Sequence, residues 1–249
     1  MLRVEGLSRR FGGLIACDEI RFSVMPREVF GIIGPNGAGK TTLFNVISGR
    51  FKPSAGRVTF EGRDVTGLSS DKIGRTGIGR TFQGVHMFRE ATVRENLRNA
   101  EVIARRHDPV AYLMRRKTSR NVGYDAICEA VGLTSHLDIV AGNLSYGVQK
   151  MLGIAMALVT SPKLLLMDEP VAGLNPSEKK SAGLLIRRLR DEFGITILLV
   201  EHDMPLVMSV CDRILVVSQG KPIALGTPAE IRAHPHVIDA YLGEDYEFA

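Results

Sequence analysis

The sequence predicts an α/β fold built on a mostly parallel central sheet. Three short apolar runs of strand length, EVFGIIG, KLLLMD and ITILLVE, are separated by stretches with helical periodicity. Strands that are apolar on both faces are typical of sheets covered by helices on both sides, and alternating strands and helices favour parallel pairing with right-handed connections. A β-rich start and a mainly helical stretch from roughly Ile73 to Thr160 are expected as additions to this core.

The size and composition are those of an ordinary globular protein. The chain has 249 residues, of which 45% are hydrophobic and 24% are charged, and this length suits one large or two small domains. No apolar run approaches the roughly 18 residues of a membrane span, and MLRVEGLSRRF lacks the apolar segment of a signal peptide. We therefore expect a cytosolic protein whose contact with any membrane is indirect. Cys17, Cys128 and Cys211 are far apart in the chain, and we expect them to be buried as small hydrophobic residues.

The net charge of +5 is concentrated in one segment, 94–121. This segment holds eight Lys or Arg and three Asp or Glu, which accounts for the whole excess. A solvated helical face is the ordinary explanation for such a run of charge. The alternative hypothesis is that the basic residues from Arg105 to Arg120 contact an anionic partner, such as lipid head groups or an acidic loop. Nucleic acid is the weaker version, because Tyr112 is the sole aromatic residue interleaved with these charges.

Helix and turn signals refine this outline. The apolar-periodic stretch LFNVISG predicts a helix that ends near Gly49, and QKMLGIAMALVTSP predicts a well-packed helix ended by Pro162. Asn175 is a good N-cap, because Pro176 takes the first helical position and Glu178 lies three residues after the cap. RILVVSQGKPIALG predicts a hairpin, and PAEIRAHPHVIDAYLG predicts a tail that is helical in pieces.

The stretch GPNGAGKT, from Gly34 to Thr41, fits the phosphate-loop pattern G-x-x-x-x-G-K-[ST] in full. Its context also fits, because a buried strand precedes it and a helix follows it. The glycines allow backbone N–H groups to turn toward phosphates, and the helix N-terminus adds partial positive charge. Lys40 is expected to reach the β- and γ-phosphates, and the Thr41 hydroxyl is expected to bind Mg²⁺. A dinucleotide-binding loop is a poorer match, because the glycine spacing differs and Lys has no role there.

Polar residues also follow the other two apolar runs. The second run ends in Asp168 and Glu169, where the aspartate is placed to hold Mg²⁺ through water and the glutamate can polarise an attacking water. His202 follows the third run, at the edge where open α/β sheets bind ligands, and is a candidate sensor of the γ-phosphate. Gln83, in RTFQG, is a weaker signal, since alone it is only a surface amide.

Together these motifs resemble the ATP-binding subunits of ABC transporters over nearly the whole chain. GPNGAGKTT is similar to Walker A, LLLMDE to Walker B, LSYGVQK to the signature sequence and AGLN to the D-loop. Gln83 falls at the Q-loop, His202 at the switch histidine and Phe11 at the aromatic residue that stacks on adenine. A finer resemblance, to the LivG-type ATPases of the branched-chain amino acid importer group, is carried by RRFGGLIACDEI, GIGRTFQGVHMFREATVRENL, EPVAGLNP and GTPAEIRAHPHVIDAYLGE.

This resemblance implies a fold and a set of site residues. The fold would be a RecA-like P-loop core with an N-terminal antiparallel β subdomain and a helical signature subdomain, so that 1–249 is one ABC ATPase domain. Residues 1–83 and 161–249 would form the core and β subdomain, and 84–160 the helical subdomain. The residues implied to contact ATP are Phe11, Gly34, Pro35, Asn36, Gly37, Ala38, Gly39, Lys40, Thr41 and Thr42. The implied catalytic residues are Lys40, Gln83, Glu169 and His202, and the implied Mg²⁺ site is made by Thr41, Gln83 and Asp168.

The resemblance also gives the signature stretch a target outside its own subunit. In this family two ATPase domains face each other head to tail, and the signature of one completes the nucleotide site of the other. The residues implied to contact ATP across this pair are Ser145, Tyr146, Gly147, Val148 and Gln149, and the D-loop is formed by Ala172, Gly173, Leu174 and Asn175. Val148 departs from the family pattern, which has Gln there, and removes a polar group near the nucleotide. Asn175 replaces the Asp of many relatives and keeps its hydrogen-bonding capacity.

The implied function is ATP hydrolysis that powers an importer of branched-chain or similar amino acids. The implied partners are a second ATPase subunit, two membrane permease subunits and, indirectly, an extracytoplasmic solute-binding protein, with the chain at the cytoplasmic face of the membrane. A urea or amide importer is the near alternative. A soluble ABC-type ATPase acting on ribosomes or nucleic acid would predict a coiled-coil insertion or a second ATPase domain, and neither is evident in the sequence. A small-molecule kinase would need neither LSYGVQK nor His202, and a non-hydrolysing subunit would not need Glu169.

Overall fold

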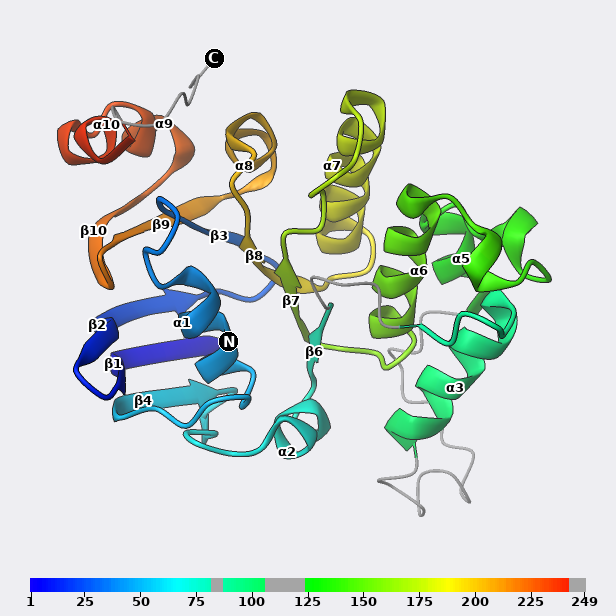
Figure 1. Ribbon diagram of the computed structural model, residues 1–249, viewed down its shortest axis with the longest axis horizontal. Coiled ribbons are helices and arrows are strands. Elements are labelled where there is room, and N and C mark those ends of the chain that lie inside the picture. The colour runs from blue at the N-terminus through cyan, green and yellow to red at the C-terminus, as the bar shows by residue number, and fades with distance from the viewer. Residues whose placement is uncertain (82–86, 106–123, 242–249) are drawn as a thin grey trace.

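A computed structural model describes residues 1–81, 87–105 and 124–241 of the chain, and its central feature is a six-stranded sheet (Figure 1). Five neighbouring strands of this sheet run parallel, and one edge strand is antiparallel to its neighbour. In sheet order the strands are β10 (Lys221–Gly226), β9 (Arg213–Ser218), β3 (Val29–Ile33), β8 (Thr196–Val200), β7 (Leu164–Asp168) and β6 (Ile78–Arg80). The three apolar runs are therefore the central strands β3, β8 and β7, as predicted.

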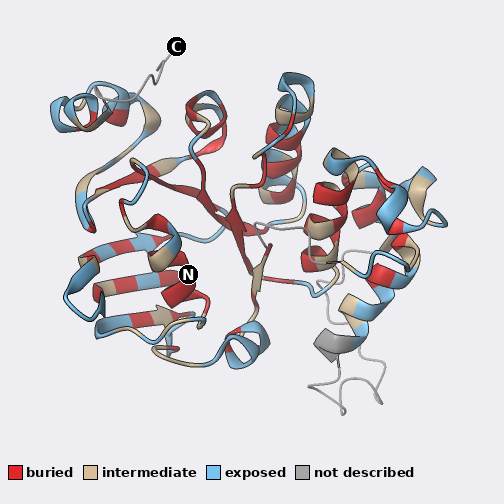
Figure 2. Cartoon of the chain, in the orientation of Figure 1, coloured by how far each residue is buried: buried red, intermediate tan, exposed pale blue. Residues whose placement is uncertain are grey.

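Alternate side chains of the central strands are buried in two separate cores, one on each face of the sheet. In β3, Val29 and Ile33 belong to one core, and Phe30 and Ile32 belong to the other. All fifteen residues of β3, β7 and β8 are buried (Figure 2). This explains why these strands are apolar in both registers.

The first core lies against the helices α6 (Tyr146–Leu158), α7 (Pro176–Asp191) and α8 (Met204–Val210). The second core lies under α1 (Lys40–Ile47) and a four-stranded antiparallel sheet in the order β2-β1-β4-β5. The strands of this smaller sheet are β1 (Leu2–Phe11), β2 (Leu14–Val24), β4 (Ala55–Phe60) and β5 (Arg63–Asp64). Because α1 contacts both sheets, the helix after the phosphate loop is fixed between two rigid layers.

The helical part of the chain lies beyond the β6 edge of the central sheet (Figure 1). Its described elements are α3 (Val93–Arg105), α5 (Tyr124–Ala130), the short 3₁₀ helices Thr134–His136 and Ala141–Asn143, and α6. They pack around Leu97, Leu133 and Leu152, which are fully buried. The helix α2 (Ser70–Arg75) precedes β6, and α9 (Pro228–Arg232) and α10 (Pro235–Tyr241) follow the β9–β10 hairpin, so the hairpin and the helical tail are as predicted.

Two further expectations concern the chain as a whole. Cys17, Cys128 and Cys211 are all buried and unpaired, as expected. Burial raises the pKa of the Cys17 thiol to about 12, so this side chain behaves as a small hydrophobic group. None of the helices in the described ranges has the length and apolar character that crossing a bilayer requires.

Candidate nucleotide-binding and catalytic site

The structure brings the predicted polar residues together at one edge of the central sheet. The phosphate loop follows β3, Asp168 ends β7 and His202 comes two residues after β8. The strand β8 lies between β3 and β7, and all three run in the same direction. Their carboxyl ends therefore meet at a single edge, which is where open α/β sheets bind ligands.

Glycine is required at two positions of the phosphate loop because other parts of the chain come very close. A Cβ on Gly34 would lie 2.0 Å from the backbone oxygen of Val217, and a Cβ on Gly39 would lie 2.1 Å from that of Ala16. Gly39 also has a left-handed backbone with φ of 98° and precedes the first residue of α1. The loop thus turns directly into the helix N-terminus, the arrangement that presents backbone N–H groups to an anion.

Lys40 lies at the start of α1 and reaches back over the loop. Its ammonium donates hydrogen bonds to the backbone oxygens of Gly34 at 2.6 Å and Pro35 at 3.0 Å. The side chain is buried, whereas Thr41, the next residue, is exposed at the mouth of the loop. The cation is therefore held against the loop backbone, where it complements a phosphate group.

Asp168 is almost fully buried, with 2% of its surface exposed. Its Oδ2 accepts a hydrogen bond of 3.0 Å from the guanidinium of Arg80. Its Oδ1 is also buried and has no hydrogen-bond partner among the described residues. Burial raises the pKa of this carboxyl, and the Arg80 charge opposes that effect by favouring the ionised form.

Glu169 differs sharply from its neighbour because the chain turns there. Its backbone is left-handed, with φ of 48°, which is uncommon for a residue with a side chain. Its N–H donates to the backbone oxygen of Val200 at 2.9 Å, and its own carbonyl accepts from the ammonium of Lys150 at 3.0 Å. The side chain remains partly exposed, and its Oε1 lies 3.8 Å from Nδ1 of His202. The backbone bonds thus aim this carboxylate toward the histidine.

The buried Glu201 organises the turn that carries His202. Its carboxylate accepts backbone N–H bonds from Val171 at 3.0 Å, His202 at 2.9 Å and Asp203 at 3.3 Å. Burial raises the pKa of Glu201, and these three donors oppose the rise. The carboxylate therefore joins the loop after β7 to the loop after β8.

The stretch LSYGVQK begins α6 and is divided between surface and interior. Ser145 caps the helix, because its hydroxyl accepts from the N–H of Val148 at 3.5 Å. Ser145 and Tyr146 are exposed, and Tyr146 has 49% of its surface accessible. Gln149 is buried, and its amide donates to the backbone oxygen of Leu144 at 2.9 Å. The side chain of Gln149 therefore supports the turn from inside, and those of Ser145 and Tyr146 are the ones presented outward.

The D-loop packs directly against this exposed turn. A Cβ on Gly173 would lie 3.0 Å from Cε1 of Tyr146, and a Cβ on Gly147 would lie 2.5 Å from Oε1 of Glu178. Asn175 caps α7 as predicted: its side chain accepts from the N–H of Glu178 at 3.0 Å, and Glu178 accepts from the N–H of Asn175 at 2.9 Å. The starts of α6 and α7 therefore form one contact surface.

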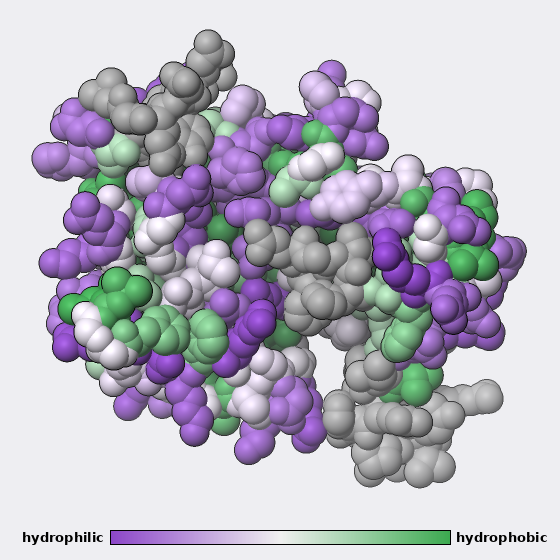
Figure 3. Space-filling view, in the orientation of Figure 1, coloured by the Kyte–Doolittle hydropathy of each residue, from purple (hydrophilic) through white to green (hydrophobic). Residues whose placement is uncertain are grey.

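Phe11 ends β1 in a small exposed apolar area. Its ring meets Phe51 edge to face with 5.4 Å between centroids, and the guanidinium of Arg9 lies 4.4 Å from its centroid. The neighbouring Leu14 and Ile15 are exposed, and Figure 3 shows hydrophobic surface at this end of the β1–β2 pair. A flat apolar group such as a nucleobase could stack on this area.

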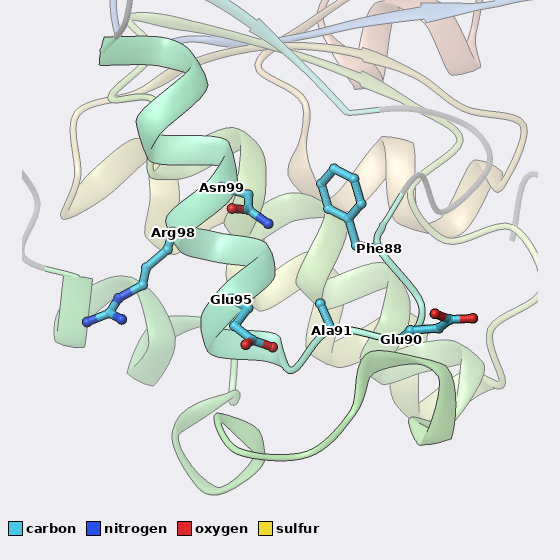
Figure 4. Close-up of a pocket in the computed structure, with 6 residues that line it drawn as sticks. All are labelled: Phe88, Glu90, Ala91, Glu95, Arg98 and Asn99. Atoms are coloured by element: carbon cyan, nitrogen blue, oxygen red, sulfur yellow. The ribbon is translucent and has the colours of Figure 1, made fainter.

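A separate hollow of about 500 Å³ lies in the helical part of the chain. Figure 4 shows its lining: Phe88, Glu90 and Ala91 come from the segment before α3, and Glu95, Arg98 and Asn99 come from α3 itself. Phe88 is 55% exposed, which is unusual for so large an apolar side chain. The hollow therefore combines one aromatic surface with charges of both signs.

Comparison with known proteins decides the family. A family model described as ABC transporter matches residues 17–172, and a second, described as branched-chain amino acid ATP-binding cassette transporter, matches residues 221–247. The chain belongs to the ABC transporter ATP-binding family. The high-affinity branched-chain amino acid transport ATP-binding protein LivG of Salmonella typhimurium is 47% identical over 250 residues, which cover 98% of each chain. The protein BraF of Pseudomonas aeruginosa, with the same description, is 45% identical over 253 residues and the same shares.

Solved ABC cassettes have the same fold as this member of the family. An ATP-binding cassette of an ABC transporter in its ADP conformation superimposes with a TM-score of 0.85 at 36% identity, covering 98% of this chain and 99% of that one. The cassette cbiO1 of Clostridium perfringens, part of the transporter complex cbiONQ, gives 0.80 at 31% identity, covering 98% and 95%. The predicted P-loop fold with its β-rich and helical additions is thereby confirmed.

Within this ABC cassette, some predicted site residues cannot be placed. Gln83 and the part of the basic segment from residue 106 to Arg120 lie outside the described residues. Arg80, Lys150 and Glu201 had no predicted role, although each contacts a site residue. Their position in the sequence could have indicated a role, because each lies inside or next to one of the motifs described above.

Proposed function

We propose that this chain is the ATP-hydrolysing subunit of a membrane importer for branched-chain amino acids. The observation that carries the proposal is the convergence of Lys40, Asp168, Glu169 and His202 at one edge of the sheet. The transport proteins with branched-chain amino acids in their names match this chain over 98% of its length. Intact catalytic residues favour a hydrolysing subunit over a structural one.

ATP would lie across the edge formed by Phe11, the phosphate loop and the start of α1. The adenine would stack on Phe11, where the exposed apolar area offers a flat surface. Gly34, Pro35, Asn36, Gly37, Ala38, Gly39, Thr41 and Thr42 would surround the phosphates. Lys40, already held over the loop, would exchange its carbonyl bonds for β- and γ-phosphate oxygens.

Mg²⁺ would be held by Thr41, Asp168 and Gln83 together with phosphate oxygens. Asp168 fits this role, because its buried Oδ1 lacks a partner among the described residues and would accept hydrogen bonds from the waters of the ion. A cation bound in this way supplies stabilisation of the negative charge that develops on the phosphate oxygens.

Glu169 is placed to orient the water that attacks the γ-phosphate. Its backbone is fixed by bonds to Val200 and Lys150, so its partly exposed carboxylate has a defined direction. His202, 3.8 Å away, would contact the γ-phosphate and hold the carboxylate in place. Lys40 and the partner's signature serine would stabilise the charge of the transferring group.

The site would be completed by a second ATPase subunit in a head-to-tail pair. The exposed Ser145 and Tyr146, with Gly147, Val148 and the N-terminus of α6, would contact the nucleotide of the partner. Gln149 would act from inside by fixing the turn. The D-loop residues Ala172, Gly173, Leu174 and Asn175 would lie in the same interface, because Gly173 packs on Tyr146.

The helical subdomain, residues 84–160, would transmit closure to two permease subunits at the cytoplasmic face of the membrane. The hollow beside Phe88, a residue five positions after Gln83, would accept a segment of a permease. Residues 1–83 and 161–249 would move with the nucleotide. A solute-binding protein outside the membrane would select the amino acid, and no nucleic-acid partner is expected.

The proposal predicts that uptake of leucine, isoleucine and valine depends on this chain. Cells lacking the gene would regain uptake of the labelled amino acids with the wild-type gene, but not with Lys40→Ala, since the loop lysine would be lost. Lys163→Ala, which removes a lysine that pairs with Glu61 elsewhere, is the matched control and should restore uptake. Labelled urea, measured in the same cells, tests the neighbouring substrate class. Restored uptake with Lys40→Ala would contradict the proposal.

A further inference from the structure

The guanidinium of Arg80 connects three elements beside the nucleotide site. Its Nη1 donates to Oδ1 of Asn45 at 2.8 Å and to Oγ of Ser48 at 2.6 Å, both on or next to α1. Its Nη2 donates to Oδ2 of Asp168 at 3.0 Å, at the end of β7. Its Cζ lies 5.1 Å from the ring centroid of Phe44, so the cation also rests on a buried aromatic face.

The fold places Arg80 here by strand register. Arg80 is the last residue of the edge strand β6 and pairs with Leu166 in the parallel strand β7, two residues before Asp168. The next residue, Thr81, continues the pairing through its N–H to the backbone oxygen of Leu166. The long arginine side chain extends along the sheet edge to the carboxylate and remains only 14% exposed.

The contact with Asp168 uses one carboxylate oxygen only. Arg can bind both oxygens of a carboxylate with its planar fork, but here Nη1 is directed to Asn45 and Ser48, and the buried Nε has no hydrogen-bond partner among the described residues. Oδ1 of Asp168 is left buried without a partner among the described residues, a condition that costs stability because a desolvated acceptor stays unpaired. Such a cost is unusual in a core and points to a ligand that supplies the missing donors.

We propose that Arg80 is a positioning residue for the divalent-cation site of this ATPase. It holds Oδ2 of Asp168 and fixes the carboxylate plane, so that Oδ1 stays available to the water shell of the cation that accompanies the nucleotide. The bonds to Asn45 and Ser48 keep the arginine from rotating to cover both oxygens. This inference rests on the proposed ATPase function, and it assigns a role to a residue outside the phosphate loop and the paired acids.

The test measures cation binding and nucleotide binding separately in the purified full-length chain. Calorimetry gives the affinity for ADP in EDTA, and electron paramagnetic resonance gives the affinity of Mn²⁺ for the ADP-bound chain. Arg80→Met should leave the ADP affinity in EDTA within about threefold of wild type. It should lower the Mn²⁺ affinity by about tenfold or more, the range found when the partner of a metal ligand is removed.

Arg213→Met is the matched control. Arg213 also pairs with a buried carboxylate, that of Glu28 at 2.7 Å, and its Cζ lies 5.3 Å from the ring centroid of Phe30, away from the phosphate loop. This control variant should change neither the ADP affinity in EDTA nor the Mn²⁺ affinity.

If Arg80→Met fails to fold, Arg80→Lys is used instead. A lysine keeps the positive charge but lacks the planar guanidinium, so a loss of about threefold in Mn²⁺ affinity is expected.

The outcomes separate the inference from the proposed function. Unchanged Mn²⁺ affinity in a folded Arg80 variant would overturn the positioning role. Equal losses of ADP affinity in EDTA and of Mn²⁺ affinity would also overturn it, because Arg80 would then act on the phosphate loop through α1. A wild-type chain that binds ADP neither with nor without the cation would instead contradict the proposed function itself.

Discussion

Two adjacent acids, Asp168 and Glu169, occupy different environments because the backbone turns between them. Asp168 ends a buried strand and is 2% exposed. Glu169 has a left-handed backbone, and its side chain leaves the sheet toward His202. One carboxylate is therefore suited to a cation's water shell and the other to an attacking water. The left-handed backbone of Glu169 thus gives two neighbouring carboxylates different environments and suits them to different roles.

We predict that Lys150→Met will slow ATP hydrolysis without weakening ATP binding. The ammonium of the buried Lys150 donates a hydrogen bond to the backbone carbonyl of Glu169. Losing this charge-assisted bond should allow the left-handed backbone of Glu169 to relax. A cost of about 1.4 kcal/mol in the transition state would lower the rate about tenfold. Steady-state phosphate release and equilibrium ATP binding are measured on the same preparation.

Lys163→Met is the control for this prediction. Lys163 forms an ion pair with Glu61 between exposed positions, so its loss should leave both quantities unchanged. If Lys150→Met hydrolyses ATP at the wild-type rate, the backbone of Glu169 does not depend on α6. A parallel loss of ATP binding would show that Lys150 supports the fold of the site as a whole.

The motif residues could be found from the sequence, but the residues that hold them in place through long-range contacts could not. The phosphate loop and the acid pair have fixed local spacing, so Lys40 and Asp168 could be placed before the structure was known. Arg80 contacts Asp168 across 88 positions of sequence, and Glu201 contacts Val171 across 30. These contacts depend on which strands become neighbours, and no local pattern encodes that order.

At the scale of elements, the residues that cap the start of α7 also form its contact with the start of α6. Asn175 and Glu178 form the predicted capping box, and Glu178 also lies against Gly147 at the start of α6. The start of α7 is thus stabilised and positioned by the same two side chains.

The strands β3, β7 and β8 were also predictable from the sequence, because burial on both faces left an unbroken apolar run. The order of the strands and the packing of α1 between two sheets followed from tertiary contacts that the runs do not contain.

We predict that Asn175→Ala will lower the free energy of unfolding by about 1 kcal/mol, the usual cost of losing an N-cap. For a chain of this length the melting temperature should fall by about 2–4 °C. Because α7 also supports the LSYGVQK turn, ATP hydrolysis by the assembled pair should fall as well. Asn175→Asp keeps an accepting oxygen and should preserve both properties. Thermal unfolding and phosphate release are the measurements.

Thr227→Ala gives the comparison for this cap. Thr227 forms the same kind of capping box with Glu230 at α9, in the C-terminal tail. The melting temperature should fall by a similar amount, while ATP hydrolysis should not change. Equal effects of the two substitutions on hydrolysis would show that the Asn175 result reflects stability alone.

At the scale of the whole molecule, two parts of the chain have different proposed roles in nucleotide binding. One part binds the nucleotide of its own subunit, and the other would contact the nucleotide of the partner subunit. The central sheet holds the phosphate loop and acids, whereas LSYGVQK begins a helix of the helical part beyond the β6 edge (Figure 1). Ser145 and Tyr146 face outward. The family resemblance predicted this division, and the relatives' fold confirms the architecture. The arrangement of a pair is a prediction that follows from this exposed position of the turn.

The shared nucleotide site is tested most directly by the mass of the Glu169→Gln chain in solution with and without ATP. This variant should bind ATP but hydrolyse it very slowly, so a closed pair should accumulate. Light scattering is measured on the chain alone and on a mixture with a second ATPase, if the same genome encodes one next to it. ATP-dependent pairing is expected in at least one sample. Adding Ser145→Arg should abolish it, whereas Ser135→Arg, a change at another exposed serine, should not. ATP binding without pairing in either sample would contradict the shared site.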